Sequence, residues 1–467
     1  MRVAGIVAEY NPFHNGHMYL LSKVREELGE DTAIVVIMSG AFVQRGIPAV
    51  TDRTARTCAA LSCGVDVVLE LPFTFATGSA DRFARGAIAS LLASGVVTDL
   101  FFGAEHPELS DLTYLAKLDP EDDPAFRSKL SELQKEGQPY AGAWQEALIA
   151  YVQSLFGASM ENDSPHLPDG ASADLPDGAS ESLPAGAGHL SPEVIAEILR
   201  NPNNLLAISY LRELHRAGSG IVPHLVHREN SYHEETLKDS AFASATAIRK
   251  LISERYASLP KPEFIRSLSD LLPYLPDDML AEMLAQWNGG TKPMGEDDLL
   301  EAALPVLRAT DSAKLAATAH VGEQLAGYLR STVRDLHYDP ATSASSLWQN
   351  SASTRCFAYT RILRALASLV VGQTQEDLES LTEPKYLRLL GFSERGRLVL
   401  KSMRKEASLP ILSRASDAFH YARDPAFARM DTLDRISHDF WTTRARGTFE
   451  EDFKREVIQY KRGKLYR

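Results

Sequence analysis

The chain has 467 residues, of which 44% are hydrophobic and 24% charged, and a formal net charge of −13 at pH 7. This length predicts two or three domains of ordinary globular composition, and the acidic balance argues against a surface coated in nucleic acid while leaving room for a local basic patch. No apolar run reaches the roughly 18 to 20 residues of a membrane helix, and no apolar signal region opens the chain, so we expect a cytoplasmic protein. Cys58, Cys63 and Cys356 are too few for a disulfide framework and lack metal-ligand spacing, so we predict no metal site.

Strands and helices alternate over the first hundred residues. Apolar, β-branched runs predict strands at 3–8, 32–38, 66–71 and 99–102, and helical periodicity or a capping serine predicts helices at 17–28, 52–62 and 79–94. This alternation is the signature of a doubly wound parallel sheet, and the predicted fold class is therefore α/β, of the Rossmann type.

The second half of the chain predicts an insertion and a further domain. From Glu161 to Gly188 the segment is rich in Pro, Gly, Ser and Asp, and Leu-Pro-Asp-Gly-Ala-Ser occurs twice, so we expect a flexible insertion at 161–188. Helices at 191–216 and 244–252 around a strand at 221–226 then complete a first domain, 1–255. The remainder, 256–467, has amphipathic segments such as 279–287, 313–333, 360–369 and 397–404, which predict an all-helical second domain.

The loop after the first predicted strand carries His14, Gly16 and His17. A buried parallel strand that leads through a loop into a helix leaves several backbone N–H groups pointing one way, which makes an anion site. Gly16 allows a ligand to approach the backbone, and the imidazoles can donate to charge that develops on an α-phosphate as pyrophosphate leaves. A single histidine here equally fits a structural role, but the pair favours adenylyl transfer from ATP.

A second anion-binding turn is predicted late in the same domain. Ser244 and Thr246 open a predicted helix, and Arg249 follows one turn later. The hydroxyls can donate to phosphate oxygens, and the guanidinium can reach the β- or γ-phosphate. A serine-capped amphipathic helix would look the same, so the turn gains weight from the histidine loop. We predict catalytic roles for His14, His17, Ser244, Thr246 and Arg249.

These two segments resemble the signatures of the HxGH nucleotidylyltransferase superfamily. Within it, the chain is similar to bacterial tRNA(Met) cytidine acetate ligases over nearly its whole length apart from the insertion. The similarity rests on Val7 to His17, Met38-Ser39-Gly40, Gln44-Arg45-Gly46, Glu70-Leu71-Pro72, Pro202-Asn203-Asn204-Leu205, Arg228 with Tyr232-His233, the Ser244 turn, and Tyr386 to Phe392. Ala207 and Glu234 depart from the expected glycine and aspartate, and neither touches the catalytic histidines.

The resemblance implies an ATP-dependent ligase that forms acetyl-adenylate and acetylates N4 of the wobble cytidine of elongator tRNA(Met). ATP, expected with Mg²⁺ on its phosphates, acetate and the tRNA are therefore the expected partners. The implied ATP-site positions are Val7, Ala8, Glu9, Tyr10, Asn11, Pro12, Phe13, His14, Asn15, Gly16, His17, Gly103, Asn203, Asn204 and Arg228. By sequence alone Gly103 equally fits a turn, the asparagines a helix cap, and Arg228 a surface arginine.

Two basic clusters are candidates for RNA phosphate contacts, with solvated helix faces as the alternative. They are Lys385, Arg388, Arg395, Arg397, Lys401, Arg404 and Lys405, and Lys454, Arg455, Lys461, Arg462, Lys464 and Arg467. Two other functions stay open: adenylyl transfer to a small coenzyme phosphate, and a non-catalytic RNA-binding protein. The large second domain argues against the former, and the complete set of catalytic candidates argues against the latter.

Overall fold

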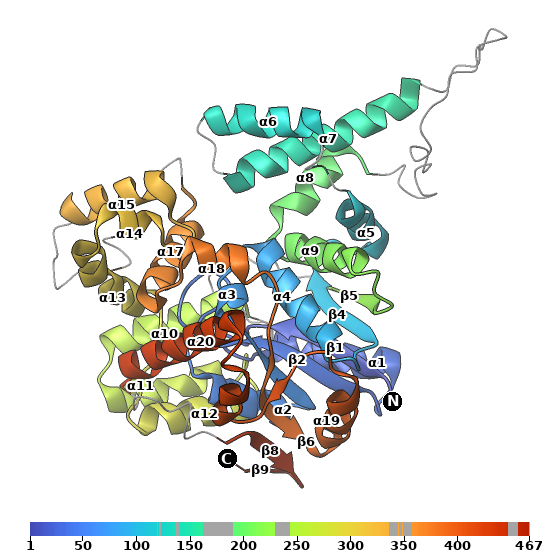
Figure 1. The fold of residues 1–467 in the computed structure, drawn as a ribbon. Helices are drawn as coiled ribbons and strands as arrows, with labels where there is room; N and C mark the ends of the chain where they lie inside the picture. Colours follow the sequence, from blue (N-terminus) through green and yellow to red (C-terminus); the bar gives the residue numbers. More distant parts are fainter. Residues whose placement is uncertain are drawn as a thin grey trace.

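The computed structural model describes residues 1–118, 120, 123–136, 140–161, 190–228, 243–335, 344, 348, 357–446 and 456–466. Within these ranges a nine-stranded sheet has the order β5-β4-β1-β2-β3-β6-β8-β9, with β7 beside β6 (Figure 1). The strands are β1 (Val3–Ala8), β2 (Ala33–Ser39), β3 (Val67–Leu71), β4 (Asp99–Ala104), β5 (Val222–His227), β6 (Leu387–Ser393), β7 (Ile411–Leu412), β8 (Ile458–Lys461) and β9 (Lys464–Tyr466).

The first five strands form the predicted doubly wound sheet. They pair in parallel in the order β3-β2-β1-β4-β5, so the winding reverses between β1 and β4. Ligands of such sheets bind outside the carboxyl ends of the strands at this reversal. The histidine loop follows β1 and Gly103 lies at the end of β4, so the predicted site falls at this position.

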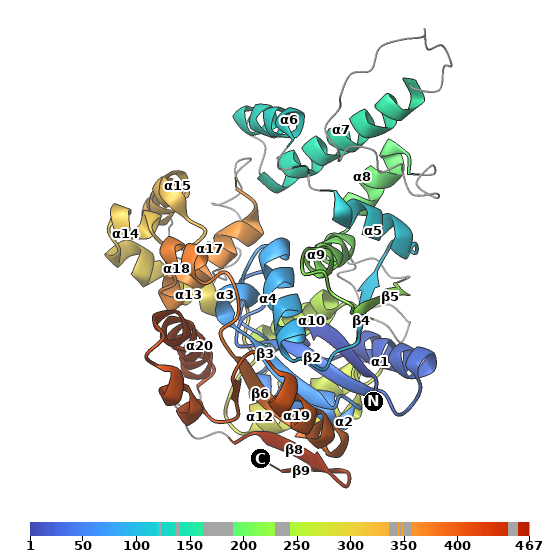
Figure 2. The ribbon, with the colours of Figure 1, turned by 45° about the vertical axis from the view of Figure 1, so that its right-hand side comes forward.

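Helices cover both faces of the sheet. They are α1 (Asn15–Leu28), α2 (Arg53–Ser62), α3 (Phe73–Ala76), α4 (Ala80–Ala93), α5 (Leu109–Lys117), α6 (Pro124–Lys135), α7 (Tyr140–Glu161), α8 (Pro192–Arg200), α9 (Pro202–Arg216), α10 (Ala245–Ser258), α11 (Lys261–Ser267), α12 (Asp277–Asn288), α13 (Glu296–Ala309), α14 (Ser312–Ala316), α15 (Gly322–Asp335), α17 (Tyr359–Val371), α18 (Gln375–Ser380), α19 (Glu394–Glu406) and α20 (Pro425–Arg444), with short 3₁₀ turns η3 (Leu268–Leu271) and η4 (Ala415–Tyr421). In Figure 2, α6 and α7 extend away from the sheet. Across the described residues, no helix is long and apolar enough to cross a membrane.

The apolar strands are buried on both faces, which explains their continuous hydrophobic sequence. In β2, Val35 and Ile37 join a core with side chains of α4 and α9, whereas Val36 and Met38 join a second core with side chains of α1, α10 and α12. Successive side chains of a strand point to opposite faces, so one run of residues supplies both cores.

Two predicted helices are interrupted. The predicted helix at 191–216 is two helices, since α8 ends at Arg200 and Pro202 begins α9. Pro202 causes the break, because a proline disfavours helical backbone geometry at the residue before it. The predicted helix at 313–333 also divides, into α14 and α15, around His320 with its positive φ of 68°.

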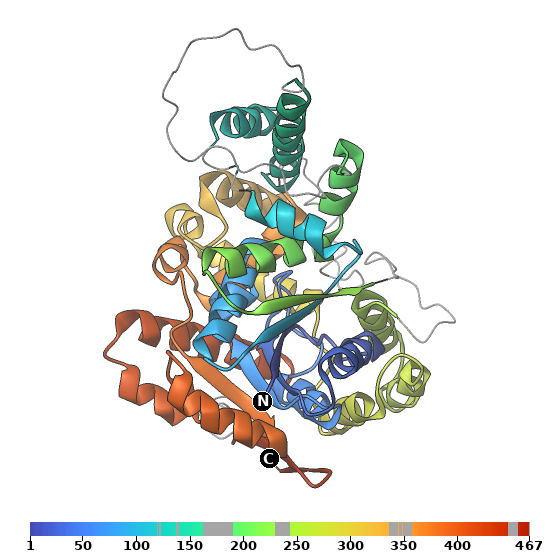
Figure 3. The same ribbon diagram turned by 90° about the vertical axis from the view of Figure 1, so that its right-hand side faces the viewer.

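The prediction of an all-helical region at 256–467 is wrong beyond residue 386. Leu387–Ser393 forms β6, which pairs antiparallel with β3, and β8 and β9 widen the same sheet (Figure 3). A short apolar run such as Leu387–Ser393 fits a buried strand and a helix segment equally well by sequence, and here the open edge of β3 selects the strand. The boundary at residue 255 stays a prediction.

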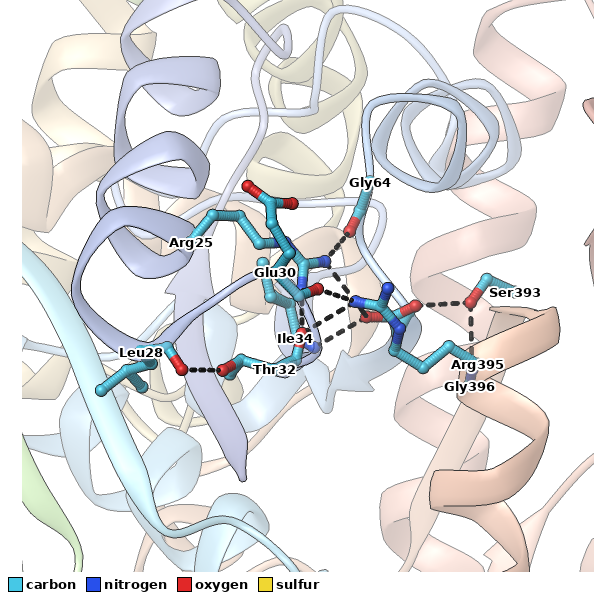
Figure 4. Close-up of polar contacts among 10 residues, drawn as sticks. Arg25, Leu28, Glu30, Thr32, Ile34, Gly64, Ser393, Arg395 and Gly396 are labelled. Atoms are coloured by element: carbon cyan, nitrogen blue, oxygen red, sulfur yellow. Dashed lines mark hydrogen bonds and ion pairs between the residues drawn. The ribbon is translucent and has the colours of Figure 1, made fainter. Parts of the chain in front are cut away.

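A buried carboxylate joins this C-terminal segment to the first domain (Figure 4). Asp66, just before β3, accepts hydrogen bonds from the Ile34 amide at 3.0 Å and the Ser393 hydroxyl at 2.6 Å. Arg395 in the first turn of α19 donates to the carbonyls of Glu30 and Thr32 at 2.8 and 3.0 Å. These hydrogen bonds therefore join α19 to the amino ends of β2 and β3, which lie opposite the predicted site.

Candidate active site

At the N-terminus of α1, both histidine rings accept a backbone hydrogen bond at Nδ1. His14 caps the helix, and its Nδ1 accepts from the Gly16 amide at 3.1 Å, while Nδ1 of His17 accepts from the His14 amide at 3.1 Å. A neutral imidazole that accepts at Nδ1 carries its proton at Nε2. The two rings lie 3.9 Å apart between centroids, so two Nε2–H donors lie side by side at the anion-binding end of the helix.

Burial keeps both rings neutral. It lowers the pKa of His14 to about 3, with Arg228 and Arg249 adding to the effect, and it lowers the pKa of His17 well below its usual value, with His14 and Arg228 adding. The positive charges of Arg228 and Arg249 therefore act on the imidazoles. Two neutral N–H donors and two guanidinium groups together favour an anionic ligand.

Gly103 and Arg228 pack directly against each other beside the histidines. Arg228 follows β5, and its amide donates to the Ala104 carbonyl at 2.9 Å. A Cβ on Gly103 would lie 2.8 Å from Cδ of Arg228. Glycine at the end of β4 therefore lets the arginine side chain pass close over the strand towards the histidines.

The predicted turn at Ser244 lies at the same edge. Ser244 caps α10 and accepts from the Ala247 amide at 3.0 Å. Arg249 donates to the Asn11 carbonyl at 2.7 Å and to the Thr246 hydroxyl at 3.1 Å, so it connects the two predicted phosphate-binding segments. The structure thus brings His14, His17, Thr246 and Arg249 together, as the sequence predicts.

The other predicted residues of the loop support its shape. Val7 and Ala8 end β1, and Pro12 follows Asn11 through a cis peptide bond. The Asn11 amide oxygen accepts from the Val50 amide at 2.8 Å, and Asn15 donates to the Pro273 carbonyl at 2.9 Å. Tyr10 and Phe13 are buried and pack against the His17 ring, with centroids 4.8 and 5.4 Å away.

Asn203 and Asn204 lie beside the loop after β4. The Asn204 oxygen accepts from the amides of Glu105 and His106 at 2.9 and 3.0 Å, and its nitrogen donates to the Ile198 carbonyl at 3.0 Å. The Asn203 nitrogen donates to the Glu105 carboxylate. These contacts hold the loop at the carboxyl end of β4, so any effect of Asn204 on ATP would pass through that loop, and direct contact stays a prediction.

Arg56 is a supporting residue that the sequence did not reveal. Its buried guanidinium donates to the carbonyls of Glu9 and Ser39 at 2.8 and 2.9 Å and also to the Gly40 carbonyl. It therefore fixes the ends of β1 and β2 together. No local signal marks an arginine in the middle of a predicted helix for this role, since its acceptors lie on two other segments.

The predicted basic clusters divide by environment. Arg388 is buried among ion pairs and Arg395 binds backbone carbonyls, whereas Arg397, Lys401, Arg404 and Lys405 are exposed on α19. Lys461, Arg462 and Lys464 belong to the β8–β9 hairpin. Lys454, Arg455 and Arg467 lie outside the described residues, as do Tyr232 and His233 and the insertion beyond Glu161.

A doubly wound sheet with paired neutral histidines and arginines at its β1–β4 crevice defines a nucleotide-binding transferase. A model of the HIGH nucleotidyl transferase family matches residues 1–450. The tRNA(Met) cytidine acetate ligases of Acetivibrio thermocellus and Syntrophomonas wolfei are 32% and 33% identical, over 94% and 95% of this chain and 94% of each relative. The chain therefore belongs to the HIGH nucleotidyl transferases and, among them, to the tRNA(Met) cytidine acetate ligase family.

Solved structures agree with this assignment. The apo form of TmcAL from Thermotoga maritima has a TM-score of 0.82 and 29% identity, with 99% of this chain and 100% of that chain covered. The same protein bound with alpha-thio ATP has a TM-score of 0.80 at the same identity and coverage.

Proposed function

We propose that this chain is an ATP-dependent ligase that acetylates N4 of the wobble cytidine of elongator tRNA(Met). The observation that carries the proposal is the pair of neutral Nε2–H donors of His14 and His17 beside Arg228 and Arg249. The activity of the relatives, which are tRNA(Met) cytidine acetate ligases, and the ATP analogue bound by the Thermotoga relative support these substrates.

In the first step an acetate oxygen attacks the α-phosphorus of ATP, and the bond to the bridging oxygen of pyrophosphate breaks. The imidazole donors would stabilise charge on the α-phosphate, and Arg249 and Arg228 would hold the departing phosphates. Orientation and charge stabilisation supply most of the acceleration in such a transfer.

In the second step the cytidine amine attacks the acetyl carbonyl, the amine loses a proton, and AMP leaves. The donors facing the site are N–H groups, and within the described part of the chain no three His, Cys, Asp or Glu side chains lie in a metal-binding arrangement. Mg²⁺ would therefore be held by the phosphate oxygens of ATP and would neutralise charge there.

Two measurements test the proposal. Pyrophosphate exchange into ATP should require acetate, and dependence on a phosphorylated metabolite instead would favour a coenzyme adenylyltransferase. Radiolabelled acetate with ATP should label elongator tRNA(Met) at N4-acetylcytidine. Absence of label from the RNA would contradict the proposal.

A further inference from the structure

A second group of basic side chains, three arginines and a neutral histidine, lies at the carboxyl end of the sheet, away from the β1–β4 site. It consists of Arg82 of α4, Arg361 and Arg364 of α17, and His320 in the turn before α15. Arg361 donates to the His320 carbonyl at 3.1 Å. The four residues come from two separate helices and a turn, so tertiary structure alone assembles the group.

Among the described residues, no acidic side chain pairs with the three arginines of this group. Burial lowers the pKa of Arg364 to about 10 and that of His320 to about 3, and neighbouring arginines lower both further. Like charges held together in this way destabilise a fold unless an anion joins them.

Two buried nitrogen atoms of this group also lack hydrogen bonds to the described residues. They are Nε of Arg364 and Nε2 of His320. By contrast, the Arg82 guanidinium donates to the carbonyls of Thr74, Leu378 and Leu381. Arg82 therefore joins α4 to α3 and to the end of α18 beside the group. Arg361 and Arg364 are half-buried, which leaves them open to a ligand from one side.

One loop connects this group to the ATP site. The amide of Gln44 donates to the Glu9 carboxylate at 2.9 Å, and two residues later Gly46 packs against α17. Gly46 has a φ of 84°, and a Cβ there would lie 2.5 Å from the Arg364 amide nitrogen. Since strands lie about 4.8 Å apart, the end of β3, which leads to Arg82, is roughly 10 Å along the edge from β1.

We propose that Arg361 and Arg364, with His320 beside them, bind a backbone phosphate of the RNA substrate next to the active site. This proposal rests on the proposed function, because the RNA base that attacks the acetyl-adenylate must reach the same edge of the sheet. The triphosphate of ATP already has Arg228 and Arg249 at the crevice. A forked guanidinium pair fits a phosphodiester, and a backbone contact would position the RNA without reading its sequence.

The test measures binding of elongator tRNA(Met) over a range of salt concentrations. Arg364→Gln and, separately, Arg361→Gln should weaken binding by at least about tenfold, since each removes a charge-assisted contact. The slope of log affinity against log salt should fall by about 0.7 to 0.9 for each lost phosphate contact. The matched control is Arg85→Gln on α4, whose partner is Glu213 at 3.7 Å and which lies outside the group.

Stability provides an independent readout. Inorganic phosphate should raise the melting temperature of the wild type more than that of Arg364→Gln, and the variant without phosphate should melt no lower than the wild type. Wild-type affinity and salt slope in both variants would overturn this proposal alone. A wild-type protein that binds no tRNA would overturn the proposed function as well.

Discussion

Two groups of arginines, one around Glu70 of β3 and one around Arg364 of α17, differ in one respect. Arg53 and Arg388 surround Glu70 of β3, with Arg53 2.5 Å from its carboxylate, and Asp431 accepts from Arg388 at 2.6 Å. Burial acts to lower the pKa of Arg388, but Tyr386 and the nearby carboxylates raise it above its ordinary value. For Arg364 burial lowers the pKa and Arg361 adds to that effect.

The difference separates arginines that support the fold from arginines that face a ligand. A buried charge that forms ion pairs within the chain, as Arg388 does with Glu70 and Asp431, leaves those partners buried and unpaired when it is removed. A charge whose partners are missing reduces stability and is retained for binding. The same distinction separates Asn204, whose amide oxygen and nitrogen both form hydrogen bonds within the chain, from His14, whose Nε2–H has no hydrogen bond to any described residue.

The largest expected effect comes from breaking the compensated group. Glu70→Gln should lower the free energy of unfolding by about 3–5 kcal/mol, because Arg53 and Arg388 would remain buried without their shared carboxylate. Burial acts to raise the pKa of Glu70, yet the two arginines hold it below its ordinary value, so the native group is charged. Chemical denaturation measures the loss. Arg364→Gln is the contrasting variant, and an equal loss in both would contradict the distinction.

The next effect concerns catalysis. His14→Asn should slow acetate-dependent pyrophosphate exchange about 100- to 1000-fold, the effect of removing one donor to transition-state charge. Asparagine is a good helix N-cap, so the hydrogen bond from the Gly16 amide can persist and stability should change little. A full rate in this variant would remove His14 from the proposed site.

Asn204 should behave in the opposite way. Asn204→Ala should lower the free energy of unfolding by about 2–3 kcal/mol, because two half-buried amides and one buried carbonyl lose their partner. Asn201→Ala is the control, since the side chain of that neighbour donates at the surface to the Glu197 carbonyl, a contact that water can replace. Unchanged stability of Asn204→Ala with a raised KM for ATP would instead support direct contact with the nucleotide.

Sequence predicted the parts of the molecule whose signal is local. The strand–loop–helix at Val3–Leu28 and the capped helix after Ser244 each contain their own apolar period and capping residue, so both were found where the structure has them. Gly103 and Arg228 were named through resemblance, and the structure adds the close packing that joins them.

Sequence could not predict features that depend on pairing between distant segments. β6 is a strand because the edge of β3 is open to it, and no property of Leu387–Ser393 alone specifies that partner. Arg56 and the group around Arg364 also draw their neighbours from remote elements. Arg388 likewise looked like a surface cation until its carboxylate partners were in place.

The smallest effect is a pH dependence shared by the two ligand-facing groups. The pKa of His14 and of His320 is lowered to about 3 in the folded chain, by burial first and then by nearby arginines. An unfolded histidine titrates near 6.5, so below that pH the unfolded chain binds more protons and stability falls as pH falls towards 3. Between pH 7 and 5.5 each ring should account for about 1 kcal/mol of this loss.

His14→Asn and His320→Asn should each reduce the loss of stability between pH 7 and 5.5 by about 1 kcal/mol. The free energy of unfolding at the two pH values measures this loss. Asparagine tolerates the positive φ of 68° at position 320, so the backbone turn can be kept. Their effects should add, since the residues belong to separate groups. An unchanged pH slope in His320→Asn would mean that this ring has the same pKa in the folded and the unfolded chain, which would contradict its burial among the arginines.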